Sequence, residues 1–276
     1  MNSTEQMIIA ASIYFLTGLG IAVLYNNLKP RPNKKWKIDG IPIIPMHSHV
    51  YESMNALINA PKILRWFKKI EKTQIELRSI LITDINWLSQ TPDPNKLGIV
   101  KIIVNGLDKT TGKHIASNVF LKGESVAILI VVKVVSITRR AKQYVLLCDN
   151  MRVATGGRQS ELCGGIMDNM GNIASAELKK VKKDIGFDIK NNNELIALGS
   201  ILTSPSACDE EIFLYAWKTI ISEEEFEEKQ CCIFGNETED EEIKLSFVPM
   251  KEMKQVILDI KDVKTECAFR RYIDLK

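Results

Sequence analysis

The pattern of hydrophobic and polar positions predicts more strands than helices. Short apolar runs between turn residues predict strands over most of residues 75–150 and again over 195–250, and the run at 125–135 is apolar enough for a fully buried strand. Apolar residues at helical spacing predict helices over 54–72, over 174–185 and in two closing segments after residue 250. The predicted class is therefore α+β, with a mixed sheet and helices packed on it.

The beginning of the chain has a different pattern. Residues 7–25 contain no charged side chain, and as a helix they would extend roughly 28 Å, the thickness of a bilayer's hydrocarbon core. A cleaved signal peptide would begin with basic residues, which residues 1–6 lack, and a core helix would show a polar stripe. We predict one transmembrane helix within residues 1–28.

The residues that follow this span predict its orientation. No basic residue precedes the span, whereas several follow it: Lys29, Arg31, Lys34, Lys35 and Lys37. The positive-inside rule then places the large C-terminal part on the cytoplasmic or matrix side of the membrane, with Tyr25 and Trp36 at the headgroups. Residues 29–53 are rich in proline and are predicted to form an extended stalk.

The rest of the chain is predicted to form two parts. Residues 54–122 are expected to contain an N-terminal helix and a β-rich subdomain, and residues 123–276 a second domain. The helix over 54–72 has lysines between its apolar positions, and we expect it to rest on the domain rather than on the membrane.

Composition excludes some classes of function. The net charge is only +3, which gives no electrostatic argument for binding nucleic acid. The six cysteines form no C-x-x-C pair, so a zinc site is not expected and a reducing compartment is indicated.

Four segments in a fixed order resemble the Nudix hydrolase superfamily, and more narrowly its ADP-sugar and ADP-ribose diphosphatases. The resemblance extends from about Pro61 to the C-terminus and implies a Nudix fold for residues 123–276. In "MRVATGGRQSELCGGIMDN" an arginine precedes a counterpart of the family's "ELPAG", and "TSPSACDEE" resembles its "SPGGCDEE" loop. The other two segments are 98–132 and 240–253.

The Nudix box keeps its spacing in this chain but loses its carboxylates. Gly165 and Gly186 stand where the motif has its two glycines, and Phe187 fills the final apolar position. The residues at the family's catalytic positions are different: Gly171 for the first glutamate, Lys179-Lys180 for Arg-Glu, and Lys183-Asp184 for Glu-Glu.

This exchange predicts that metal-dependent hydrolysis is lost. The family's carboxylates are expected to hold Mg²⁺, which polarises the diphosphate and helps to generate the attacking hydroxide. Lysines in place of two of them change the local charge by about four units and repel a dication. We therefore expect no catalytic residues, no enzyme activity and no cofactor, with Mg²⁺ relevant only to residual activity.

Three interpretations of the basic helix remain open. Its lysines form a solvated face, or Lys180 and Lys183 bind a nucleotide diphosphate directly, or Asp184 holds a metal weakly with Glu239 or Glu241. The resemblance makes two further residues candidates for nucleotide binding. Arg152 resembles a substrate-contacting arginine of the family, and Glu161 aligns with the glutamate of "ELPAG", although a salt bridge in a loop would explain both.

These features lead to an expected function. We expect a membrane-anchored, non-catalytic accessory subunit of a large complex, in the mitochondrial inner membrane with its domain in the matrix, such as a respiratory-chain or ATP-synthase assembly. The alternative locations are the endoplasmic reticulum or the outer mitochondrial membrane, with a cytosolic domain. The alternative functions are a tethered ADP-ribose or ADP-sugar hydrolase and a nucleotide-diphosphate sensor. Whether the chain pairs with itself or with a foreign subunit stays open.

Overall fold

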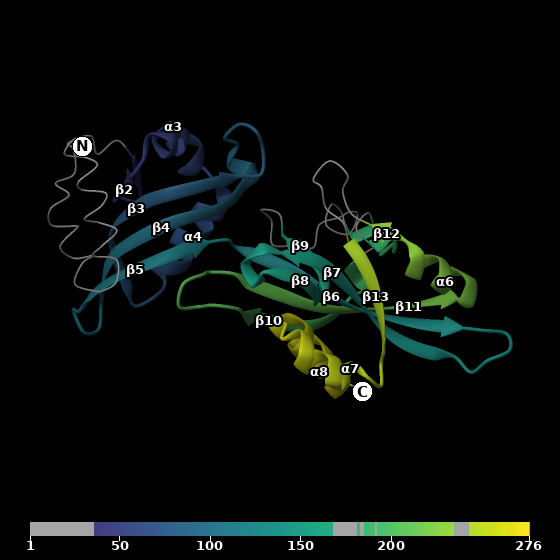
Figure 1. The fold of residues 1–276 in the computed structure, drawn as a ribbon. Helices are drawn as coiled ribbons and strands as arrows, with labels where there is room; N and C mark the ends of the chain where they lie inside the picture. Colours follow the sequence, from purple (N-terminus) through teal and green to yellow (C-terminus); the bar gives the residue numbers. More distant parts are fainter. Residues whose placement is uncertain (1–35, 168–180, 183–184, 191, 235–242, 276) are drawn as a thin grey trace. The chain divides into compact units, whose positions relative to one another are not determined.

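The computed structural model describes residues 36–167, 181–182, 185–190, 192–234 and 243–275 and divides the chain into two compact units (Figure 1). The first unit comprises the chain up to Lys122 together with Ser204–Asp209, and the second comprises Gly123–Thr203 and Glu210–Lys276. Several residues of the sequence-based predictions lie outside the described residues: Gly171, Lys179, Lys180, Lys183, Asp184, Glu239 and Glu241.

The first unit is built on a five-stranded sheet in the order β1-β2-β3-β4-β5. Strand β2 is parallel to β3, and the other neighbours are antiparallel. The segment Ser204–Asp209 returns to this sheet, since Phe120 of β5 donates from its amide to the carbonyl of Ala207 at 2.8 Å. The strands are β1 (Trp36–Ile38), β2 (Ile41–Pro45), β3 (Ile75–Trp87), β4 (Leu97–Asp108) and β5 (His114–Leu121).

Two helices cover one face of this sheet, α3 (Ser48–Leu57) and α4 (Pro61–Glu71). Their buried residues share one core with alternate residues of β3 and β4, as the period of a strand requires. The sequence predicts one helix over 54–72, whereas the structure has two. Pro61 accounts for the break, because proline is favoured in the first turn of a helix and disfavours helical geometry at the residue before it.

The predicted stalk is wrong for residues 36–53, which form β1, β2 and the start of α3. Trp36 is buried rather than placed at lipid headgroups, and its indole nitrogen donates to the Asn55 side chain at 2.9 Å. Burial of Ile38 and Ile43 in the same core explains why this proline-rich stretch is folded.

The predicted membrane span cannot be compared with the structure, because residues 7–25 lie outside the described part of the chain. Among the residues that the structure does describe, no helix is both long enough and apolar enough to cross a bilayer. The span stays a prediction from the sequence.

The second unit contains an eight-stranded mixed sheet. The main path runs β10-β11-β6-β7-β13-β12, while β8 pairs with β7 and β9 pairs with β6. Strands β6 and β11 are parallel, and the remaining pairs are antiparallel. The strands are β6 (Glu124–Val135), β7 (Lys142–Arg152), β8 (Gly157–Glu161), β9 (Cys163–Ile166), β10 (Ile196–Leu202), β11 (Glu211–Ser222), β12 (Ile233–Phe234) and β13 (Ile243–Pro249).

Cores on both faces of this sheet make the second unit a layered structure. Alternate residues of β6 contribute to two different clusters, Ile128 and Ile130 to one and Leu129 and Val131 to the other. Helices α7 (Met253–Ile260) and α8 (Val263–Asp274) pack into the second cluster. The first cluster includes Val181, Ile185, Phe187 and Ile189, and Phe226 of α6 (Glu223–Cys231) packs against it. The predicted α+β class, a mixed sheet between helices, is confirmed.

Candidate functional site

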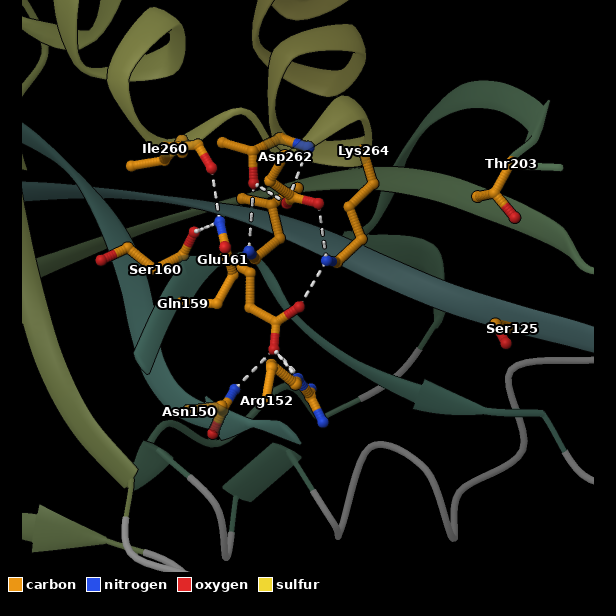
Figure 2. Close-up of polar contacts among 12 residues, drawn as sticks. Ser125, Asn150, Arg152, Gln159, Ser160, Glu161, Thr203, Ile260, Asp262 and Lys264 are labelled. Atoms are coloured by element: carbon orange, nitrogen blue, oxygen red, sulfur yellow. Dashed lines mark hydrogen bonds and ion pairs between the residues drawn. The ribbon is translucent and has the colours of Figure 1, made fainter. Parts of the chain in front are cut away.

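Glu161 is a buried carboxylate at the end of β8 and lies at the centre of a polar cluster (Figure 2). Its Oε1 accepts hydrogen bonds from the Asn150 side chain at 2.9 Å and from the Arg152 guanidinium, whose Nε is 2.7 Å away. Its Oε2 accepts from the ammonium group of Lys264 on α8. The antiparallel pairing of β7 with β8 positions Asn150 and Arg152 beside Glu161.

These donors keep Glu161 ionised. Burial alone would raise its pKa, but Lys264, Asn150 and Arg152 together hold the pKa below its ordinary value. The side chain of Glu161 is only 7% exposed, whereas that of Arg152 is 49% exposed. The guanidinium of Arg152 therefore neutralises Glu161 and still reaches solvent.

A capping arrangement holds Lys264 in place. Asp262 is the N-cap residue of α8: it accepts from the Thr265 amide at 3.3 Å and from the ammonium group of Lys264 at 2.9 Å. The hydroxyl of Thr265 in turn accepts from the Leu162 amide at 3.2 Å. Figure 2 shows the result, in which β8 is tied to the beginning of α8 through Lys264 and Asp262.

The candidates Arg152 and Glu161 are thus brought together in a salt bridge, which joins the neighbouring strands β7 and β8. Lys264 and Asn150 were missed. Lys264 lies 103 positions from Glu161. The sequence near it contains an N-cap aspartate, Asp262, a residue type that indicates a helix start but no partner for Lys264.

The carboxylates of the "DEE" motif also have donors. Glu210 accepts from the Ser125 hydroxyl at 2.8 Å and from the Thr203 hydroxyl at 3.3 Å, and Glu211 accepts from Ser200 at 2.7 Å. In the first unit, Asp209 accepts from the Lys122 amide at 2.7 Å. Asp209 is thus held within the first unit, whereas Glu210 and Glu211, which follow the Ser204–Asp209 segment, are held within the second.

Part of the Nudix-like box lies within the described residues. Val181 and Ile185 are buried helical residues, and Gly186 follows them with a φ of +69° while its amide donates to the Lys182 carbonyl at 2.8 Å. This is a left-handed glycine that ends a helix. Lys182 forms an exposed ion pair with Asp188 at 2.8 Å.

The described carboxylates do not fit a Mg²⁺ site. Mg²⁺ requires free oxygen ligands in near-octahedral geometry, whereas both oxygens of Glu161 accept from cationic side chains. In the described ranges, no three His, Cys, Asp or Glu side chains come together in a metal-binding group. The box positions that would decide the matter, Lys180, Lys183 and Asp184, lie outside those ranges.

Comparisons with known proteins give one clear relationship. No family model matches the chain. In sequence the chain is 24% identical, over 221 residues, to "Nudix hydrolase 14, chloroplastic" of Arabidopsis thaliana, an alignment that covers 74% of this chain and 68% of the plant protein. A crystal structure of an ADP compounds hydrolase superposes with a TM-score of 0.47 at 14% identity, covering 72% of this chain and 95% of that one. The sequence relationship agrees with the order of motifs described above: the chain is similar to a plant Nudix hydrolase over most of its length.

Proposed function

We propose that the chain is a Nudix relative that has lost metal-dependent hydrolysis and serves as a non-catalytic, membrane-anchored accessory subunit of a large membrane complex. The observation that carries the loss of activity is the sequence of the box, in which Gly171, Lys180 and Lys183 stand at glutamate positions of the motif. The environment of Glu161 agrees with this loss. Its two oxygens are occupied by Arg152, Asn150 and Lys264, so the carboxylate links β7, β8 and α8. A divalent cation would have to displace two cationic side chains to reach it.

The sequence of the box supports the same proposal. Of the four glutamate positions of the motif, one is Gly171, two are Lys180 and Lys183, and only Asp184 keeps an acidic side chain. A single carboxylate flanked by ammonium groups is a poor ligand set for Mg²⁺, which is bound in such sites through several carboxylates and the substrate phosphates.

Membrane anchoring and complex membership rest on the sequence. The uncharged residues 7–25 and the basic residues after them support one span with the folded units on the matrix side of the mitochondrial inner membrane. A chain whose box has lost the carboxylates expected to bind metal, but which keeps a folded sheet domain, is suited to a structural role in an assembly.

Native electrophoresis tests the proposal. The protein would be extracted from its own membrane in mild detergent, separated on a native gel and identified by mass spectrometry, with each band assayed for Mg²⁺-dependent hydrolysis of ADP-ribose. We expect comigration with a large complex and no hydrolysis. A free monomer or homodimer that releases AMP would contradict both parts of the proposal.

Restoring the acidic positions tests the chemical explanation. In Lys180→Glu with Lys183→Glu, we expect Mn²⁺ to bind roughly tenfold more tightly, by calorimetry, without efficient hydrolysis, since Gly171 still lacks its carboxylate. Lys182→Glu is a control for added negative charge in the same segment, because Lys182 is paired with Asp188 and aligns with no metal-binding position; it changes the net charge half as much as the double variant. Equal Mn²⁺ affinity in the control and the double variant would contradict the explanation.

A second candidate function is supported by the homology. The plant relative is named a hydrolase, and Asp184 with Glu239 or Glu241 would give a tethered ADP-ribose or ADP-sugar hydrolase, or a sensor that binds such a nucleotide through Arg152 and the lysines. Calorimetry with ADP-ribose, with and without Mg²⁺, separates these alternatives from the accessory subunit. Binding without turnover would indicate the sensor.

A further inference from the structure

Helix α4 has two chemically different faces. Its buried face consists of Lys62, Ile63, Trp66 and Phe67, which pack into the core of the first unit or lie against it. The other face is basic: Lys68, Lys69 and Lys72 are exposed and Arg65 is partly exposed. These four positions follow the spacing i, i+3, i+4 and i+7, so they form one stripe along the helix. Glu71 is the acidic residue in the helix sequence.

A fifth cation extends this stripe from a neighbouring turn. The ammonium group of Lys109, between β4 and β5, donates to the carbonyl of Thr73 at 3.0 Å and to that of Glu71 at 3.5 Å. Lys109 is thereby held at the C-terminal end of α4, where the helix dipole also favours positive charge. The residues of this α4 basic stripe are Arg65, Lys68, Lys69, Lys72 and Lys109.

The pairing of the strands places the Lys109 end of the stripe near the start of the described chain. Trp36 of β1 pairs with Ile43, which pairs with Ile80, whereas Asp108, the neighbour of Lys109, pairs with Ile75. Three strand spacings across the sheet and the register along β3 place Lys109 roughly 22 Å from Trp36. Residues 26–35, between the predicted span and β1, reach at most roughly 35 Å.

We propose that the α4 basic stripe is a second membrane contact, which lies on the anionic lipid headgroups of the leaflet that the predicted span leaves. The proposal rests on the membrane anchoring proposed above. An exposed helix face with several cations and one carboxylate is complementary to a negatively charged surface. The short connection to the span keeps the stripe within reach of that surface. The stripe would hold the first unit against the bilayer.

Lysine reactivity in nanodiscs tests this contact. The full chain is reconstituted into discs of phosphatidylcholine alone and into discs with about 30% phosphatidylglycerol, then treated with a water-soluble acetylating reagent and analysed by mass spectrometry. We expect Lys68, Lys69 and Lys72 to react at least roughly threefold more slowly in the anionic discs, and this protection to disappear in 0.5 M NaCl. Exposed Lys96, in the turn at the opposite end of the β3–β4 pair, is the internal control and should react equally in both.

Charge reversal supplies a matched pair of variants. Lys109, as a member of the stripe, should also react more slowly in anionic discs, and Lys68→Glu, Lys69→Glu and Lys72→Glu together should abolish that difference. Lys142→Glu, Lys251→Glu and Lys254→Glu, at exposed positions of the second unit, change the net charge equally and should leave the protection of α4 intact. Equal reactivity of α4 in both lipids, or equal effects of the two variants, would overturn the proposal and leave an acidic protein surface as the partner of the stripe.

The anchor is tested separately in the same preparation. Neutral discs should capture the chain through residues 7–25 and not through the stripe. If neutral discs do not capture the chain, the proposed anchor is contradicted and the proposed lipid contact of the stripe is not. If only anionic discs capture the chain, and the α4 variant loses that capture, the lipid contact is supported without the anchor.

Discussion

Among the residues that the structure describes, the buried charged side chains are Lys62 in the first unit and Glu161 in the second, and the surroundings of the two charges differ. Glu161 in the second unit is surrounded by two cations and an amide, whereas Lys62 in the first unit donates to the backbone carbonyls of Leu97 and Gly98. Burial lowers the pKa of Lys62 to about 8 against a favourable effect of Asp209, while ion pairs and hydrogen bonds lower that of Glu161 despite burial. A downward pKa shift therefore means destabilisation of the charged lysine and stabilisation of the charged glutamate.

Removal of the Glu161 charge should have the largest effect. Glu161→Gln leaves Arg152 and Lys264 close together without their counter-ion, and we expect a loss of about 3 kcal/mol in the free energy of unfolding, measured by urea denaturation. Glu252→Gln, whose ion pair with Lys251 is exposed, should cost less than about 0.5 kcal/mol. Similar losses in the two variants would show that the Glu161 cluster has no special role.

The pH dependence of this difference has a definite sign. The pKa of Glu161 is depressed in the folded protein, so its stabilising contribution is present above the unfolded value of about 4.5 and is lost as the pH falls below it. The stability gap between the wild type and Glu161→Gln should therefore narrow below about pH 4.5.

Two glycines, Gly164 in the second unit and Gly98 in the first, should differ in their tolerance of alanine. A Cβ on Gly164 would lie 2.1 Å from the carbonyl oxygen of Val126, whereas a Cβ on Gly98 would meet mainly the movable Asn86 side chain at 2.4 Å, with the Asn86 carbonyl at 2.9 Å. We expect Gly164→Ala to cost about 2 kcal/mol and Gly98→Ala about 1 kcal/mol in thermal unfolding. Gly165→Ala is the control, because nothing lies within 4 Å of its Cβ, and it should be close to neutral.

Alkaline pH should relieve the cost of burying the charged Lys62 side chain. With a folded pKa of about 8 and an unfolded value of 10.5, the unfolded chain binds more protons between these values, so stability rises with pH in that window. The free energy of unfolding of Lys62→Met should be within about 1 kcal/mol of that of the wild type at pH 7. Between pH 7 and pH 10.5 the wild type should become more stable relative to the variant by about 2 kcal/mol, after allowance for partial solvation. A constant difference across this range would contradict the comparison.

The sequence predicted the elements whose patterns are long and regular. The run at 125–135 is β6, and the closing periodic segments are α7 and α8. It did not predict β1 and β2, because the prolines in residues 29–48 hide the alternation that buries Ile38 and Ile43. It likewise gave no sign that Ser204–Asp209 would join the first unit, since a backbone pairing with Phe120 depends on no particular side chain.

The candidate site was predictable only in part. Arg152 and Glu161 are nine positions apart on neighbouring strands, and their motif identified both as one site. Lys264 comes from a helix far along the chain, and the sequence contains many lysines with similar surroundings. What distinguishes Lys264 is the capped start of α8, which a pattern predicts as local structure and not as a partner of Glu161.

The return of Ser204–Asp209 to the sheet of the first unit has a consequence for biosynthesis. The ribosome releases residues 36–122 before it makes this segment, so β5 is first exposed without the partner that Phe120 and Lys122 later bind. The first unit can therefore complete its hydrogen bonding only after much of the second has been synthesised. A nascent chain that stops before Asp209 leaves this edge of β5 without its partner, and an unpaired strand edge is prone to pair with other chains.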